Sequence, residues 1–339
     1  MVIFTAVQVN KNIKIVLNYF LGPLLFAFLC FSIYKEIQHQ PRLSESWQQI
    51  KSSAESIKII FLLLPLLMIF LNWGLEAWKW KLSVAPVATV SFWQAFKATL
   101  SGVTFSVSMP NRVGEYLGRV LYLPEGSRLK TISVTIVGSF AQLLITLMAG
   151  LAGLVILKKE LQIAFPGIFL WYQFVFYGLI LLVAVMLLLY FNVSGVVNLF
   201  NRWIKNQKYF YLVEALQSFS SELLLKLLLI SFLRYCVFVL QYILLFYFFG
   251  VDVGAITICW VMTVVFLALA VIPSISIVEV GVRGEVSLKL MGIFSSNFLG
   301  IGLTSVTIWF INLVLPAIMG SLFMLNLRVF KKSKVKSQK

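Results

Sequence analysis

The chain has 339 residues, of which 60 % are hydrophobic and 12 % are charged. A soluble protein carries roughly twice that fraction of charged residues, so the composition excludes an ordinary soluble domain and predicts an integral membrane protein. The formal net charge of +16 would indicate nucleic acid for a soluble protein. In a membrane protein it first reflects how the chain is oriented in the bilayer, so we expect no nucleic-acid partner.

Apolar runs long enough to cross a bilayer begin near the N-terminus. Each offers about 20 or more positions, which is what a helix rising about 1.5 Å per residue needs to cross a 30 Å hydrocarbon core. These runs cover residues 12–34, 57–80, 131–157, 166–191, 227–250 and 298–325. Two further apolar stretches, 84–109 and 254–273, end at prolines. We predict one all-α, polytopic membrane domain over residues 1–339, with about six full spans and two broken or re-entrant helical elements.

Lysine and arginine are unequally distributed between the two predicted sides of the membrane. With the N-terminus in the cytoplasm, most of them lie on the cytoplasmic side, as the positive-inside rule requires. Both termini are therefore predicted to be cytoplasmic, including the basic tail 326–339. Residues 196–226 alternate apolar and basic positions, which is typical of an amphipathic helix on the membrane surface and equally compatible with a linker between two halves.

Residues 57–157 and 227–325 repeat one order of elements, with residues 166–226 connecting them. Each half has a span, a shorter apolar helix, a stretch containing proline, glycine and charge, and a second span. Three pairs of residues stand 170 positions apart: Gly114 and Gly284, Gln142 and Asn312, and Arg119 and Lys289. These matches predict an internal duplication. If the short helices re-enter the membrane, an odd number of crossings separates the repeats and makes them inverted, a recurring transporter architecture.

The first interrupted element contains Pro110, which ends a helix because it cannot donate a backbone hydrogen bond. Gly114 is predicted as a second break, because glycine allows an unusual backbone angle or a close approach. Arg112, Glu115 and Arg119 have a spacing that places them on one helical face. A broken backbone at membrane depth needs polar partners, and the N-terminus of its second half would suit an anion such as phosphate.

The second interrupted element contains Pro273 in the same role, and we predict further helix breaks at Gly281 and Gly284. Glu279 and Arg283 stand at i and i+4, which favours a helical ion pair. Glu285 adds a third charged position. An alternative is that both interrupted elements are interfacial loops whose charged side chains lie in water.

Arg234 lies about eight residues into the run 227–250. It either extends to the cytoplasmic surface or serves as the counter-ion of a carboxylate or a lipid phosphate. Gln142 and Asn312 are expected to form hydrogen bonds between helices. Charged residues inside a membrane are costly, and we therefore predict that those at the two breaks bind an anionic headgroup. This candidate site comprises Arg112, Glu115, Arg119, Arg234, Glu279, Arg283 and Glu285.

Two segments resemble a known family. MPNRVGEYLGR at 109–119 and IPSISIVEVGVRGEVSL at 272–288 are similar to the two signatures of the lysylphosphatidylglycerol synthase transmembrane-region family, also called flippase-like. The order of apolar segments is similar over 12–325, although Ser276, Ile277 and Val278 stand where the family has a glycine-rich stretch. The resemblance implies a multipass inner-membrane (plasma-membrane) protein, related to the lipid-translocating part of bifunctional aminoacyl-lipid synthases.

In those synthases a cytoplasmic transferase domain follows the membrane part, whereas here residues 326–339 follow the last run. We therefore expect no aminoacyl transfer and no enzymatic activity. The preferred interpretation is a flippase or transporter of a lipid or lipid-linked headgroup, with anionic membrane lipids as partners. The three cysteines lack metal-ligand spacing, so we expect no metal and no cofactor.

Two alternatives remain open from the sequence. The first is a membrane-embedded transferase acting on a lipid, in which Glu115 and Glu279 supply acid–base chemistry. The chain has one histidine and no cysteine paired with a base, which disfavours that alternative. The second is a non-catalytic membrane assembly factor.

Overall fold

The structure is a computed structural model that describes residues 43–107, 114–167, 169–195, 197, 215–272 and 276–325, together with Phe31, Tyr34 and Gln38. Over these residues the chain forms helices and no strand, which confirms the predicted all-α polytopic class. The predicted span 12–34, the amphipathic segment 196–226 and the basic tail 326–339 lie wholly or largely outside the described residues.

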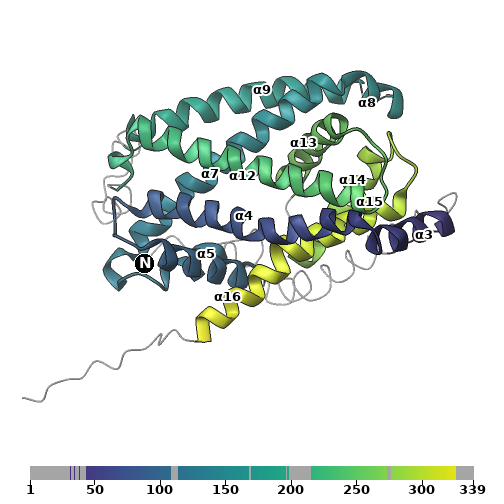
Figure 1. The fold of residues 1–339 in the computed structure, drawn as a ribbon. Helices are drawn as coiled ribbons and strands as arrows, with labels where there is room; N and C mark the ends of the chain where they lie inside the picture. Colours follow the sequence, from purple (N-terminus) through teal and green to yellow (C-terminus); the bar gives the residue numbers. More distant parts are fainter. Residues whose placement is uncertain are drawn as a thin grey trace, which may run out of the picture.

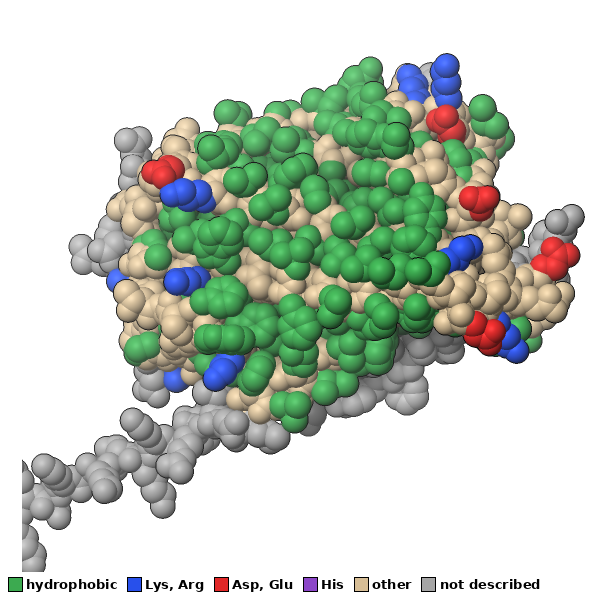
Figure 2. Space-filling model, in the orientation of Figure 1, with side chains coloured by type: hydrophobic (Ala, Val, Ile, Leu, Met, Phe, Trp, Pro, Cys, Tyr) green, Lys and Arg blue, Asp and Glu red, His purple; other side chains and the backbone are tan. Residues whose placement is uncertain are grey.

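Five helical segments among the described residues are long and apolar enough to cross a membrane. They correspond to five of the six predicted runs. The segments are α4 (Ile60–Val84), α7 (Arg128–Ile156), α9 (Phe169–Phe191), α12 (Ser221–Phe248) and a continuous segment of α15 (Phe298–Trp309), the π-helical turn η7 (Phe310–Val314) and α16 (Leu315–Leu325). Figure 2 shows hydrophobic side chains covering the middle of one face, with charged side chains gathered towards its two ends.

Local signals define both ends of α12. Ser220 caps its N-terminus, where the side-chain oxygen accepts a hydrogen bond from the Leu223 backbone N–H at 3.2 Å. Gly250, with φ of +72°, follows its C-terminus, where a left-handed residue is common. Because the cap lies at Ser220, residues 221–226 belong to this helix and not to the amphipathic segment predicted to extend to 226.

Helices from the two halves of the chain pack against each other. α4 and α12 lie side by side at the centre (Figure 1). The shorter helix α5 (Phe92–Val107) packs against α16, and α13 (Ala255–Val271) packs against α7. The short helix of each half of the chain therefore lies against the last span of the other half. At about 1.5 Å per residue, α5 and α13 are about 24 and 26 Å long, less than a hydrocarbon core of about 30 Å.

Close backbone contacts hold the first interrupted element together. α5 is followed by α6 (Gly114–Val120), and the two helices pack against each other. A Cβ atom at Gly114 would collide with the backbone of Phe105, and one at Gly118 would come within 2.5 Å of the Gly102 Cα. Glycine is needed at these positions because two backbones meet there. Pro110 lies outside the described residues.

The second interrupted element differs from the prediction. α14 (Ser276–Met291) packs against α13, while Pro273 between them lies outside the described residues. Gly281 and Gly284 are buried inside α14, so the prediction that they break the helix is wrong. Unlike proline, a glycine keeps the N–H that continues the helical hydrogen bonds, and a membrane helix packed against its neighbours tolerates it.

Replacing Gly114 by alanine tests the α5–α6 contact. The added methyl group must displace the Phe105 backbone, so we expect a loss of about 1–3 kcal/mol of stability, seen as a lower unfolding temperature in detergent. The matched control is Gly126→Ala, because a Cβ atom there meets nothing within 4 Å. Equal unfolding temperatures for the two variants would contradict this packing.

Candidate functional site

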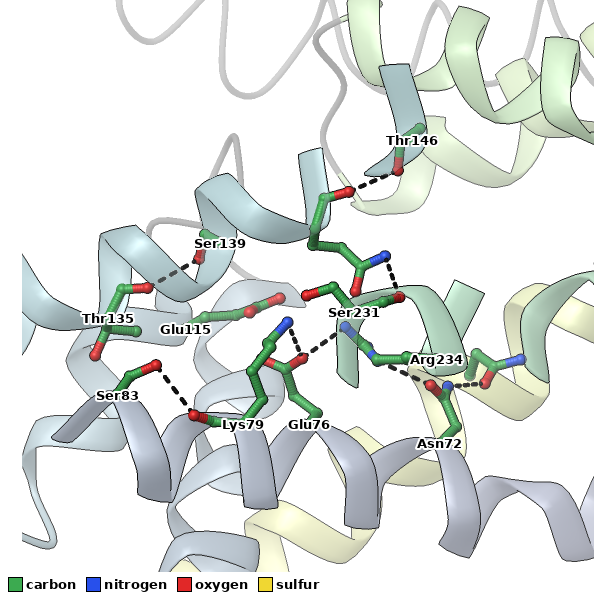
Figure 3. A network of polar contacts seen from close by, with 12 residues as sticks. Asn72, Glu76, Lys79, Ser83, Glu115, Thr135, Ser139, Thr146, Ser231 and Arg234 are labelled. Carbon is green, nitrogen blue, oxygen red and sulfur yellow. Dashed lines mark hydrogen bonds and ion pairs between the residues drawn. The ribbon is translucent and has the colours of Figure 1, made fainter. Parts of the chain in front are cut away.

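The candidate site is centred on Glu76, a carboxylate on the spanning helix α4. Its residue surface is 5 % exposed. Three cations contact its carboxylate oxygens, with N–O distances of 2.7 Å to Lys79, 3.0 Å to Arg119 and 2.7 Å to Arg234. These partners come from α4, α6 and α12. Figure 3 shows the contacts of Lys79 and Arg234. Burying a carboxylate costs free energy unless the carboxylate is paired and hydrogen-bonded. Each oxygen of Glu76 has such a partner.

Glu115 extends this group of charges. Arg119 donates a hydrogen bond to its carboxylate at 3.0 Å while also holding Glu76. We call Glu76, Lys79, Glu115, Arg119 and Arg234 the central ion cluster. Three of its members, Glu115, Arg119 and Arg234, were predicted as site residues. Arg112, predicted with them, lies outside the described residues.

Sequence reasoning missed Glu76 and Lys79. The run 57–80 was treated as an ordinary span, although it contains an acidic residue followed three positions later by a basic one. Such a pair lies on one side of a helix, and an ionisable residue inside a membrane segment is a functional-site hypothesis by default. Applying that rule to every span would have identified both residues.

Arg234 is directed into the bundle. Its guanidinium carbon lies 5.2 Å from the ring centre of Trp73 and 5.3 Å from that of Phe238. Cation–π contacts of this kind stabilise a desolvated arginine. Of the two predicted roles, the structure places Arg234 against Glu76 and not at the membrane surface.

A chain of side-chain amides continues from Arg234. The guanidinium donates to Asn72 at 2.8 Å, and Asn72 donates to Asn312 at 2.7 Å. Asn312 donates to Gln241 at 3.0 Å, and Gln241 donates to the Pro65 carbonyl oxygen at 3.0 Å. Asn312 lies in η7, and π-helical turns are frequent at functional sites. Asn312 therefore joins helices, as expected, and so does Gln142, which donates to the Ser231 carbonyl oxygen at 3.3 Å.

The second interrupted element contributes a separate ion pair. Arg283 donates to Glu279 at 2.7 Å, in the predicted i, i+4 arrangement. It also donates to the Tyr242 hydroxyl at 2.9 Å, and Tyr242 is fully buried on α12. The Glu279–Arg283 pair is therefore held against α12.

A central cavity of about 50 Å³ joins the two elements. Glu115 from the first element borders it together with Glu279 and Arg283 from the second, and Arg234 borders it from α12. Trp73, other apolar side chains and the amide of Asn312 close the remaining sides. A volume of this size holds about one or two water molecules, so this conformation is closed to a lipid headgroup.

Two arginines and two glutamates line this cavity, Arg234 and Arg283 with Glu115 and Glu279. When the remaining members of the central ion cluster are added, the described residues of the cluster and of the second ion pair have four cationic and three anionic side chains: Lys79, Arg119, Arg234 and Arg283 with Glu76, Glu115 and Glu279. Among the described residues, no group of three or more histidine, cysteine, aspartate or glutamate side chains could hold a metal ion. The chemistry that this arrangement supports is recognition of an anion by guanidinium groups.

Glu285 lies apart from the other predicted residues. It pairs with Lys289 at 3.4 Å and does not border the central cavity. Because α14 is one continuous helix, the six positions from Glu279 to Glu285 turn the side chain about 120° around the axis. The structure therefore separates Glu285 from the cavity that Glu279 borders.

The fold and the central ion cluster define a polytopic helical membrane protein with charged residues buried between its spans. The chain belongs to the family described as the lysylphosphatidylglycerol synthase TM region, whose model matches residues 20–320. This match confirms the resemblance found in the segments 109–119 and 272–288. No curated protein and no solved structure matches the chain.

Neutralising Glu76 tests the central ion cluster. Glu76→Gln leaves three cations without their shared carboxylate, so we expect a loss of about 3–5 kcal/mol of stability and a lower unfolding temperature in detergent. The matched control is Glu222→Gln, which removes an exposed i, i+4 pair with Lys226 on α12 and should change little. Similar unfolding temperatures for both variants would show that the buried pairs do not form.

Proposed function

We propose that the protein moves a lipid or a lipid-linked anionic headgroup across the membrane. The observation that carries the proposal is the central cavity, where side chains of both interrupted elements meet and the guanidinium groups of Arg234 and Arg283 are available to an anion. Membership of a family that takes its name from the membrane region of a lipid-modifying synthase gives independent support for a lipid-related function.

The proposed mechanism begins with the arginines. A phosphate is a stronger partner for a guanidinium than a single carboxylate oxygen is, because it offers several acceptor oxygens and can be held in a bidentate way. An entering phosphate would therefore share Arg283 with Glu279 and Arg234 with Glu76. Rearranging these pairs requires movement of α14 relative to α12 and α4. Binding of the headgroup and opening of the cavity are coupled in this way.

We also propose that the two halves form an inverted repeat in which the pairs α5–α6 and α13–α14 re-enter the membrane. The exchanged packing of α5 on α16 and α13 on α7 supports this proposal. So does the spacing of the last spans, since α7 starts at Arg128 and α15 at Phe298, 170 positions later. In such transporters one repeat rocks against the other around a site near the midplane.

In this proposal the protein resides in the plasma (inner) membrane with both termini in the cytoplasm, and anionic lipids are its partners. It forms and breaks no covalent bond. The excess of lysine and arginine on one predicted side supports the orientation.

Cysteine labelling tests re-entry. In a chain with its native cysteines replaced by serine, Ser91→Cys lies before α5 and Gly126→Cys lies after α6, and both positions are exposed. If the pair re-enters, a membrane-impermeant thiol reagent labels both from one side. Lys158→Cys, beyond the span α7, should be labelled from the other side. Labelling of the first two positions from opposite sides would overturn re-entry.

Lipid translocation in liposomes tests the function. With purified protein and a fluorescent anionic phospholipid, we expect Arg283→Gln and Glu115→Gln to slow protein-dependent translocation by about tenfold or more, because each alters a charge at the cavity. Lys226→Gln is the control, since Lys226 is exposed on α12 and distant from the cavity lining.

Each variant would be checked for a single folded species in detergent before reconstitution. Wild-type rates in folded Arg283→Gln and Glu115→Gln proteins would refute the assignment of the site. Chemical modification of the lipid during the assay would instead favour a membrane-embedded transferase.

A further inference from the structure

A second binding region lies away from the central cavity, where α8 (Lys158–Ala164), α9, α13 and α14 meet. Two cavities of about 310 and 320 Å³ adjoin there and share Phe165 and Lys289. We call them together the peripheral groove. Each has about six times the volume of the central cavity and the size of an ordinary ligand pocket.

The 320 Å³ cavity of the peripheral groove is apolar. Apart from Lys289, its walls are aliphatic and aromatic side chains such as Val175, Val264 and Ala268. The Tyr172 hydroxyl donates to the Leu154 carbonyl oxygen at 2.7 Å, so Tyr172 presents its ring to the groove. Such walls suit a hydrocarbon chain and offer little to a polar ligand.

Aromatic residues indicate the depth of this groove in the membrane. Trp171 and Tyr172 both line it at the beginning of α9, and Trp171 has 71 % of its surface exposed. Tryptophan and tyrosine concentrate where the hydrocarbon core meets the headgroups. The polar end of the peripheral groove therefore lies at headgroup level, and its apolar part extends towards the hydrocarbon.

The polar end carries both signs of charge. Lys289 and Glu285 line the 310 Å³ cavity, and their 3.4 Å separation is longer than the 2.6–3.0 Å of the other ion pairs among the described residues. Glu160 borders an adjoining crevice that is too narrow for a water molecule, and it lines neither cavity of the groove. A ligand in the 310 Å³ cavity meets one cation and one carboxylate, Lys289 and Glu285, which disfavours a headgroup with negative charge alone.

We infer that the peripheral groove binds a zwitterionic phospholipid with a phosphoethanolamine headgroup. One acyl chain occupies the apolar cavity, and the phosphate lies against the Lys289 ammonium. The lipid ammonium then meets the Glu285 carboxylate. This site is separate from the central cavity and does not depend on the proposed transport function.

Native mass spectrometry of delipidated protein in detergent tests this inference. The probes are phosphatidylethanolamine and its N-acetyl derivative, which keeps the phosphate and loses the positive charge. We expect the wild-type protein to prefer the first. Lys289→Gln and Ala268→Phe, which fills the apolar cavity, should each weaken phosphatidylethanolamine binding by about tenfold. Glu285→Gln should abolish the preference between the two lipids.

Matched controls separate this groove from other lipid contacts. Lys158→Gln removes an exposed lysine on α8, and Ala270→Phe adds the same ring at an exposed position of α13 outside the groove. If Lys289→Gln binds phosphatidylethanolamine as these controls do, the groove is not a headgroup site. Since Lys289 is 65 % exposed, that variant should fold even if Ala268→Phe does not. Equal wild-type binding of both lipids would overturn the assignment of a zwitterionic headgroup.

Discussion

The buried carboxylate of Glu76 constrains the arrangement of three helices. A charge inside a membrane span is expensive unless opposite charges compensate for it. Three cations compensate the charge of Glu76: Lys79 on the same helix, Arg119 on α6 and Arg234 on α12. Because Arg119 and Arg234 both reach one carboxylate, α6 and α12 both face the side of α4 that carries Glu76. The position of the first interrupted element therefore follows from an electrostatic requirement as well as from packing.

Backbone packing supplies the second constraint. Gly102, Gly114 and Gly118 let α5 and α6 approach so closely that no side chain fits between them. This approach brings Glu115 and Arg119 towards α4 and α12, where the apolar surfaces of the spans exclude water. The central cavity is only about 50 Å³, so entry of the proposed headgroup requires the packed helices to move. In the proposed transport, this movement would accompany the rearrangement of ion pairs.

Two regions of the molecule differ in the charges that they offer to a lipid. The central cavity is lined by two arginines and two glutamates, and the described residues of the central ion cluster and of the second ion pair together have one cation more than anions. The peripheral groove combines one exposed lysine with one carboxylate at the end of an apolar channel. Headgroup charge therefore distinguishes the ligands proposed for the two regions, while the acyl chain alone would not.

The sequence by itself determined what depends on local composition. Apolar length identified the spans, and the i, i+4 spacing identified the Glu279–Arg283 pair, because both properties belong to a single helix. The same reasoning located Glu115, Arg119 and Arg234 as charges too costly to be incidental.

Only the tertiary structure decided which charges meet. Glu76 lies 43 positions from Arg119 and 158 from Arg234, and no periodicity relates residues on different helices. The tertiary structure also separated Glu285 from Glu279. Because α14 continues as one helix through Gly281 and Gly284, the two side chains point in different directions around its axis. Whether a glycine interrupts a membrane helix or lets a neighbour approach depends on the surrounding helices, and the chain's own sequence does not contain that information in local form.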